Sequence, residues 1–369
     1  MRYAIAASAL LGAVAAAPQM INIDAALAVP TPTILGPKVE ETKAAPISYN
    51  PTVAASAVAV VVKEEGVIEK RVVADSCGAQ LPGGVGQVPG DGSVSAYLDK
   101  NGDLRKAAQA ATADTAPSGY TQSFQDLTGS SQQVGYLTYK NLDTYSPQAC
   151  ADFCDSEKYC QGFNVYFERD PKFEPKDGCA NPPAVTNIKC SIYGYNVAAK
   201  AATNDGQWRG PQDANGESFH VVITGSNGYS KNSRALPSIT DFNAGEALPA
   251  AINAPLDNGY DTYNGMRLFN NNPYDPALCA AACEAQTEYD VAHPAADGSY
   301  KACNFFTSYV LTKNDVPLGT YCALYTRSWD RTYAVNTGFF DGDDVYSVRN
   351  AASYALTNFK ASVKPTAQQ

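Results

Sequence analysis

Two stretches share one pattern: residues 145–154 read YSPQACADFC, and residues 274–283 read YDPALCAAAC. In each, a residue that accepts hydrogen bonds at helix starts, Ser146 or Asp275, precedes a proline. Proline suits the first helical position, because its missing N–H has no partner there in any case. The two cysteines that follow are four residues apart and therefore lie on one face of a helix. The pattern predicts two short helices, each with both cysteines turned toward a neighbouring sheet.

A longer repeat surrounds both stretches. The matched positions are Gly135 and Gly259, Cys150 and Cys279, Cys154 and Cys283, Cys160 and Cys303, and Cys190 and Cys322. Aromatic and alternating runs between them indicate strands. The expected elements are helices at 149–154 and 277–285, and strands at 136–139, 162–167, 190–194, 219–223, 304–310, 322–326 and 345–349. An internal repeat of this kind indicates two domains. We therefore expect an α+β fold of two tandem small disulfide-stapled modules, each a short helix packed on an antiparallel sheet.

The cysteine pattern resembles that of PAN/apple-like modules, which occur in secreted proteins, including tandem-domain proteins of filamentous fungi. The resemblance rests on C-x-x-x-C in the helix, a third cysteine before the central strand and a fourth in a later strand, and it covers 135–229 and 259–354. It implies a nested pairing, Cys150–Cys190 with Cys154–Cys160 and Cys279–Cys322 with Cys283–Cys303. Cys77 and Cys179 are left over, and their bridge would tie segment 72–134 to the first module.

The remaining segments have distinct compositions. Residues 1–17 have a basic start, an apolar run and an A-x-A-type end, which is typical of a signal peptide. Residues 18–71 contain no cysteine and end in the dibasic pair Lys70-Arg71, which indicates a pro-segment with a processing site. The rest of the expected layout is an N-terminal extension of the first module at 72–134 with a helix over 104–111, a connector at 230–258 and a polar tail at 355–369.

Composition narrows the classes of function. The chain has ten cysteines, two histidines and a net charge of −10. An even number of cysteines in an oxidising compartment indicates disulfides, and no C-x-x-C pair is present for zinc. The negative charge disfavours nucleic acid as a partner. The acidic loops at 99–103 and 341–344 leave calcium open as an alternative to polar turns. We expect a secreted protein, extracellular or associated with a cell wall, with no membrane span, no cofactor and no metal.

The sequence contains no recognisable catalytic constellation, so we expect a binding protein and not an enzyme. Glycan or extracellular protein is the expected partner, and the oligomeric state stays undetermined. A structural or host-interaction protein is the alternative, with a polysaccharide hydrolase as the third hypothesis. Tyrosine is abundant, with 23 residues, and its flat face and polar tip suit sugar stacking and interfaces. The candidate ligand-binding residues are Tyr166, Tyr193, Tyr309, Tyr325 and Arg169.

Overall fold

The computed structural model describes residues 21–37, 46–58, 77–113 and 116–361. The expected signal peptide and the Lys70-Arg71 pair lie outside the described residues, as does the end of the expected tail from residue 362. Within the described residues the protein is a mixed α/β structure with two antiparallel sheets and few helices.

The first sheet has six strands in the order β1-β6-β3-β4-β2, with β5 also pairing with β6. Its strands are β1 (Tyr120–Leu127), β2 (Tyr136–Asn141), β3 (Gly162–Pro171), β4 (Ala184–Tyr193), β5 (Gly206–Arg209) and β6 (Phe219–Lys231). The helices α3 (Val94–Leu98), α4 (Asp103–Ala113) and α5 (Pro147–Ser156) accompany this sheet, and a short 3-10 turn (Ala199–Ala201) follows β4. Side chains of α3, α4 and α5 share one hydrophobic cluster with β3 and β4, so they cover the same face.

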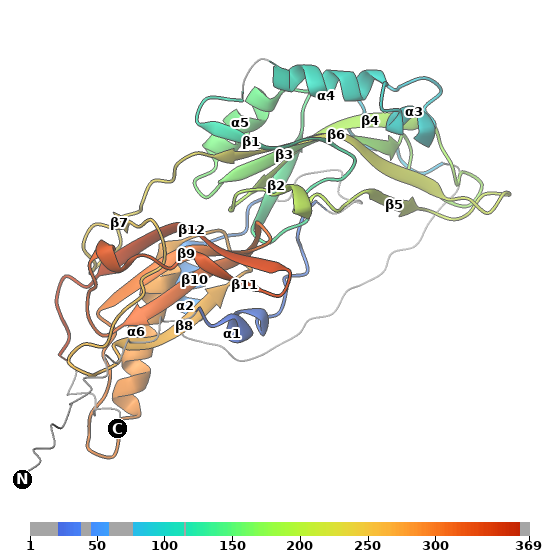
Figure 1. Ribbon diagram of the computed structural model, residues 1–369. Coiled ribbons are helices and arrows are strands. Elements are labelled where there is room, and N and C mark those ends of the chain that lie inside the picture. The colour runs from blue at the N-terminus through green and yellow to red at the C-terminus, as the bar shows by residue number, and fades with distance from the viewer. Residues whose placement is uncertain (1–20, 38–45, 59–76, 114–115, 362–369) are drawn as a thin grey trace, which may run out of the picture.

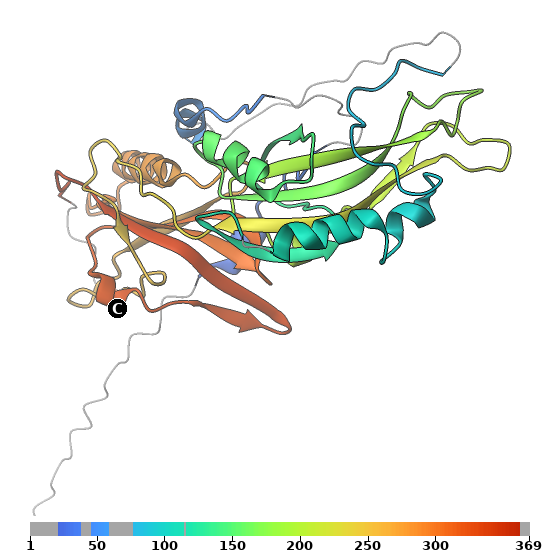
Figure 2. The ribbon, with the colours of Figure 1, turned by 90° about the horizontal axis from the view of Figure 1, so that it is seen from above.

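The second sheet also has six strands, in the order β11-β12-β9-β10-β8, with β7 also pairing with β12. Its strands are β7 (Glu246–Ala247), β8 (Tyr263–Phe269), β9 (Phe305–Lys313), β10 (Val316–Tyr325), β11 (Gly338–Asp341) and β12 (Asp344–Ala355). The long helix α6 (Pro276–Ala292) covers one face, and a 3-10 turn (Arg331–Tyr333) precedes β11. Figures 1 and 2 show the two sheets as adjacent bodies joined by the connector.

The two sheets have the same topology. Strands β1 to β6 correspond in chain order to β7 to β12, and each pairing in the first sheet has its counterpart in the second. The helices α5 and α6 also occupy equivalent places along the chain, since α5 connects β2 to β3 and α6 connects β8 to β9. The repeat seen in the cysteines therefore extends to the backbone connections.

Both predicted helix starts are confirmed. The Ser146 hydroxyl accepts a hydrogen bond from the amide of Ala149 at 3.1 Å, and the Asp275 carboxylate accepts one from Ala277 at 3.0 Å. Helix α6 continues to Ala292, seven residues beyond the predicted end, because the residues after 285 are compatible with a helix and part of its face packs on the second sheet.

Five disulfides tie α5, α6 and the segment that begins at Cys77 to strands or loops of the two halves. They are Cys77–Cys179, Cys150–Cys190, Cys154–Cys160, Cys279–Cys322 and Cys283–Cys303. These are the same pairs that the sequence led us to expect. In each half, one bridge joins the helix to a central strand, β4 or β10. A second bridge joins the helix to the loop just before β3 or β9. Several disulfides are consistent with an extracellular protein.

The segment expected to be a pro-segment is partly built into the fold. Helix α1 (Ile23–Leu27) lies on the second sheet, where Ile21, Ile23 and Ala26 join the core that contains Tyr309 and Tyr321. The backbone N–H of Asn22 donates to the Tyr321 hydroxyl at 3.1 Å. Helix α2 (Pro51–Val58) packs against α6.

Two expected boundaries differ from the structure. Strand β1 lies inside 72–134, so this region contributes an edge strand to the first sheet as well as two helices. Strand β7 lies inside the expected connector and pairs with β12 through Ala247 and Glu246. Both segments become strands because the long strands β6 and β12 each offer an edge with which they can pair. The local sequence does not reveal this pairing.

Candidate functional site

The four tyrosines selected from the sequence are buried. Tyr166 and Tyr193 are 0% exposed, and Tyr309 and Tyr325 are 1% exposed. They lie on the central strands β3, β4, β9 and β10, whose residues are buried on both sides. Alternation separates the two faces of a strand, but both faces are covered here, so neither presents a tyrosine to solvent. The assignment of these four tyrosines as ligand-binding residues is therefore wrong, because none of their side chains is exposed.

Arg169 is also occupied inside the protein. Its Nε donates to the carbonyl of Gly92 at 2.8 Å, and its Nη1 donates to the carbonyl of His220 at 2.6 Å. The guanidinium lies over the ring of Phe219 at 4.1 Å. Arg169 therefore anchors the loop before α3 to strand β6, which corrects its assignment as a ligand-binding residue.

A group of buried ionisable side chains lies on the first sheet. The ammonium of Lys189 contacts the carboxyl group of Glu168, and the carboxylate of Asp170 accepts a hydrogen bond from Asn187 at 2.6 Å. Burial raises the pKa of Glu168 to about 8, and the neighbouring Asp170 adds to that shift. Glycosidase chemistry requires paired carboxylates at a cavity. Glu168 and Asp170 do not line the cavity described next, so we interpret this group as structural.

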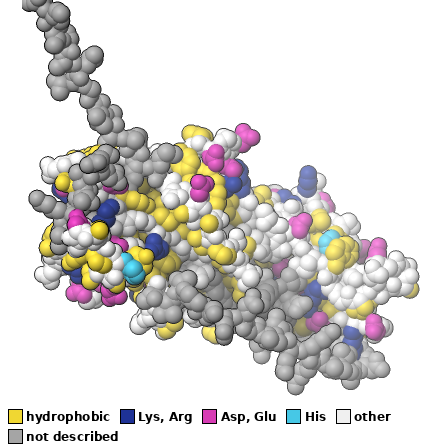
Figure 3. Space-filling model, turned by 90° about the horizontal axis from the view of Figure 1, so that it is seen from below, with side chains coloured by type: hydrophobic (Ala, Val, Ile, Leu, Met, Phe, Trp, Pro, Cys, Tyr) yellow, Lys and Arg dark blue, Asp and Glu magenta, His cyan; other side chains and the backbone are white. Residues whose placement is uncertain are grey.

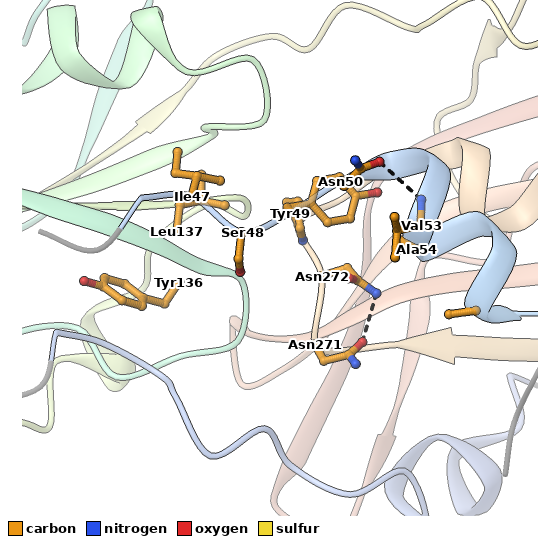
Figure 4. A pocket seen from close by; sticks show the side chains of 12 residues that line it. Ile47, Ser48, Tyr49, Asn50, Val53, Ala54, Tyr136, Leu137, Asn271 and Asn272 are labelled. Atoms are coloured by element: carbon orange, nitrogen blue, oxygen red, sulfur yellow. Dashed lines mark hydrogen bonds between the residues drawn. The ribbon is translucent and has the colours of Figure 1, made fainter. Parts of the chain in front are cut away.

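A cavity of about 220 Å³ lies where the two halves meet, and we call it the inter-sheet cavity. Its lining comes from three places: helix α2 with the segment that leads into it, the start of β2, and the loop before α6 (Figure 4). The lining residues are Ile47, Ser48, Tyr49, Asn50, Val53, Ala54, Ala57, Tyr136, Leu137, Asn271, Asn272 and Pro273.

Close packing between the halves fixes the walls of this cavity. The amide of Tyr274 donates to the carbonyl of Gly194 at 3.3 Å, and a Cβ atom on Gly194 would lie only 2.2 Å from the Cβ of Pro273. The Tyr195 hydroxyl, from the first half, is 3.0 Å from the hydroxyl of Thr320 in the second. The loop that carries the asparagines is therefore held directly against the first half.

Tyr49 lines the inter-sheet cavity and contacts both halves. Its hydroxyl donates to the carboxylate of Asp275 at 2.7 Å, and its ring makes an edge contact with Tyr159, with the ring centroids 4.8 Å apart. Burial, together with the charge of Asp275, raises the pKa of Tyr49. The hydroxyl therefore stays protonated at neutral pH and holds residues 46–50 across both halves.

The lining of the inter-sheet cavity suits a neutral polar ligand. Asn50, Asn271 and Asn272 carry amides that both donate and accept hydrogen bonds. In Figure 4, Asn272 donates to Asn271, and Asn50 accepts from the backbone at Val53. Apolar side chains such as Leu137 lie opposite. Small-molecule sites commonly combine an apolar lining with a few polar groups.

A second feature is an exposed aromatic pair on the edge strand β5. Trp208 is 61% exposed, and its ring stacks on His220 with the centroids 4.0 Å apart. Burial, followed by the charge of Arg169, lowers the pKa of His220. The neutral imidazole thus supports one face of the indole while the rest of the ring meets solvent. The only sign of this pair in the sequence is the rarity of tryptophan, because Trp208 is one of just two in the chain.

Charges do not gather on the face drawn in Figure 3. Its visible acidic and basic side chains are scattered among hydrophobic and uncharged polar ones. Within the described residues, no group of three or more His, Cys, Asp or Glu side chains could hold a metal ion. In the loop at 341–344, Asp344 instead pairs with Lys313 at 2.7 Å. In the part of the chain that the structure describes, none of the helices is long and apolar enough to cross a membrane.

Comparisons of the chain with protein-family models, with curated proteins and with solved structures found no match. The functional interpretation therefore rests on the geometry of this structure. Sequence reasoning missed the asparagines of the inter-sheet cavity, although the run Asn270-Asn271-Asn272-Pro273 directly before the predicted helix start was a visible sign of a polar loop.

Proposed function

We propose that this is a secreted, non-catalytic binding protein that recognises carbohydrate in the inter-sheet cavity. We further propose that its two halves are tandem PAN/apple-like modules. The shared strand topology and the nested disulfides support the second statement, and the composition of the cavity supports the first.

The observation that carries the proposal is that amide and tyrosine side chains line one cavity. Sugar hydroxyls both donate and accept hydrogen bonds. The side-chain amides of Asn271 and Asn272 can accept from and donate to such hydroxyls. Tyr136 adds an aromatic surface for the apolar face of a sugar ring. A volume of about 220 Å³ accommodates one or two sugar units and not a folded partner.

The test is retention of the full chain on insoluble chitin, β-glucan and cellulose, followed by titration with soluble oligosaccharides of the polymer that retains it. We expect the double variant Asn271→Ala/Asn272→Ala to weaken binding roughly tenfold or more, because each amide contributes hydrogen bonds in a partly buried site. Asn215→Ala, at an exposed loop residue, is the matched control. Binding that is equal in both variants would overturn the assignment of this cavity.

A protein partner is the second candidate, and the Trp208–His220 pair favours it. Tryptophan is enriched at interfaces and among the residues that carry most of their binding energy. An exposed indole on an edge strand is therefore a plausible anchor for a protein surface. If no polysaccharide retains the chain, and Trp208→Ala abolishes cross-linking to a defined extracellular protein while leaving folding intact, this second function replaces the first.

A further inference from the structure

Trp208 of β5 and Phe340 of β11 occupy equivalent positions in the two halves. Strand β5 pairs with the first part of β6, and β11 pairs with the first part of β12. Each strand begins with a glycine, Gly206 or Gly338, and the aromatic residue stands two positions later. Both glycines have a positive φ, 117° and 123°, and a Cβ atom on either would lie only 2.0 or 1.9 Å from a carbonyl oxygen of the neighbouring strand. The internal repeat therefore extends to these two rings.

Both rings are open to solvent. Trp208 is 61% exposed and Phe340 is 78% exposed. The ring next to Phe340 behaves differently, because Phe339 stacks on Tyr346 with the centroids 5.2 Å apart. An apolar ring that stays in water gains nothing from burial on folding, so folding gives no reason to repeat such a ring in both halves. A large aromatic side chain in this setting is typical of an interaction surface.

The strands that carry these rings are edge strands. Among the strands of the described ranges, β5 pairs only with β6, and β11 pairs only with β12. Figure 1 shows both strands toward the right-hand side of their sheets. The edge of a sheet can add a further strand from another chain through backbone hydrogen bonds. This setting favours a polypeptide partner, because only a polypeptide supplies the matching row of N–H and C=O groups.

The charge near both rings favours a cationic partner. Exposed carboxylates lie within three positions of each ring, with Asp205 before Trp208, and Asp341 and Asp343 after Phe340. The face of an aromatic ring attracts cations, and neighbouring carboxylates strengthen that attraction. A second copy of this chain would instead bring like charges together. The two edges therefore fit lysine and arginine side chains better than they fit each other.

The basic groups of these strands do not offset the exposed carboxylates. Arg209 in β5 is buried and pairs with Glu174 at 2.8 Å. Beside the turn between β11 and β12, Lys313 pairs with Asp344 at 2.7 Å. Burial, followed by the charge of Arg169, lowers the pKa of His220, so the imidazole under the indole stays neutral.

We propose that β5 with Trp208 and β11 with Phe340 are two equivalent docking edges for an extended segment, rich in lysine or arginine, of another protein. The segment adds to the edge of the strand, and its cationic side chains contact the aromatic ring and the nearby carboxylates. The proposal goes beyond the carbohydrate function, because neither ring lines the inter-sheet cavity. It also gives the protein partner considered for Trp208 a second anchor and a charge.

The experiment is calorimetric titration of the full chain with a short peptide of alternating lysine and threonine. Three comparison probes are the same peptide with a methylated backbone, a glutamate–threonine peptide and a chitosan oligosaccharide. We expect the lysine peptide to bind at two sites per chain, the methylated peptide to bind roughly tenfold more weakly, and the glutamate peptide not to bind.

Three results of this titration would overturn the proposal. The first is no binding of the lysine peptide, and the second is equal binding of the glutamate peptide. The third is chitosan binding as tightly as the lysine peptide, which would show that amine groups suffice and that the partner need not be a polypeptide.

Variants locate the two sites. Trp208→Ala should weaken binding at one site roughly tenfold, Phe340→Ala should do the same at the other, and the double variant should lose both. Phe359→Ala is the matched control, since Phe359 is 67% exposed and lies outside both strands. None of these changes alters the charge, so a general attraction between an acidic protein and a basic peptide would survive in the double variant. Unchanged binding there would refute the two edges.

Measurements on the unaltered protein complete the test. The chain has two tryptophans, and Trp329 is only 8% exposed, so a shift in tryptophan emission on adding the lysine peptide reports on Trp208. No shift would contradict the proposal. Self-association of the chain that the double variant abolishes would identify a second copy as the occupant and would also overturn it. The Asn271→Ala/Asn272→Ala protein should keep its peptide binding, so failure of the carbohydrate proposal and failure of this one give different results.

Discussion

Replacing Ile23 with alanine should detach helix α1 from the second sheet without unfolding the sheet. Ile23 is 8% exposed and packs in the core beside Tyr309 and Tyr321, whereas Leu27 of the same helix is 49% exposed. Truncation of a buried isoleucine to alanine costs about 2–5 kcal/mol, and a site at the edge of a core belongs at the low end. About 2 kcal/mol corresponds to a roughly 30-fold larger detached population.

Hydrogen exchange of the backbone amides measures that population. The Ala26 amide donates to the carbonyl of Asn22, and the Ala28 amide donates to Asp24, so both report on α1. Their protection should fall roughly 30-fold in Ile23→Ala, while amides in β9 and β10 keep theirs, because a short helix without a disulfide can open as a local unit. Leu27→Ala is the matched control and should change protection little.

Two results would refute this reasoning. If protection in β9 and β10 falls together with that of α1, the helix and the sheet open as one cooperative unit. If α1 protection does not change, Ile23 does not anchor the helix. The expected result has a structural consequence, because detachment of α1 uncovers the sheet face that carries Tyr309 and Tyr321.

Three further predictions concern stability. Burial raises the pKa of Glu168 to about 8, so the folded state keeps a proton that the unfolded chain loses near pH 4.3. The resulting stabilisation is present below pH 4 and is lost as the pH rises toward 8. The midpoint of urea unfolding should therefore fall as the pH is raised from 5 to 8, and it should fall less in Glu168→Gln. An equal fall in both proteins would contradict this prediction. Gly194→Ala should cost about 1–3 kcal/mol in urea unfolding, because its Cβ would meet Pro273 at 2.2 Å, and unchanged stability would show that the halves separate easily. Non-reducing peptide mapping should recover the Cys77–Cys179 link, and replacing both cysteines with serine should cost at most about 4–5 kcal/mol for a separation of 102 residues; free thiols at these positions would disprove the link.

Much of the fold could be predicted because its signals are local. Ser146 and Asp275 start helices through hydrogen bonds to amides two or three residues ahead, so a few letters of sequence suffice. The ends of elements were less predictable: β3 was expected to stop at residue 167 and extends to Pro171, because pairing with β4 continues there. Strands β1 and β7 depend still more on their partners, since each is ordered by an edge formed over a hundred residues away.

The candidate sites were much less predictable than the fold. The alternating pattern placed Tyr166 and Tyr309 on strands, but only the packing of loops and of α1 shows that their faces are covered. Asn271 is an ordinary polar residue in the sequence. It becomes notable only because it lines a cavity where the two halves meet.

The sequence by itself determined the helix starts, the strand-forming runs and the cysteine spacing that repeats in both halves, because these depend on neighbouring residues. The tertiary structure alone decided which faces are buried and that residues 47–57 contribute one wall of the inter-sheet cavity. Burial and the pairing of polar groups are set by contacts between segments far apart in the chain, and no local pattern encodes those contacts.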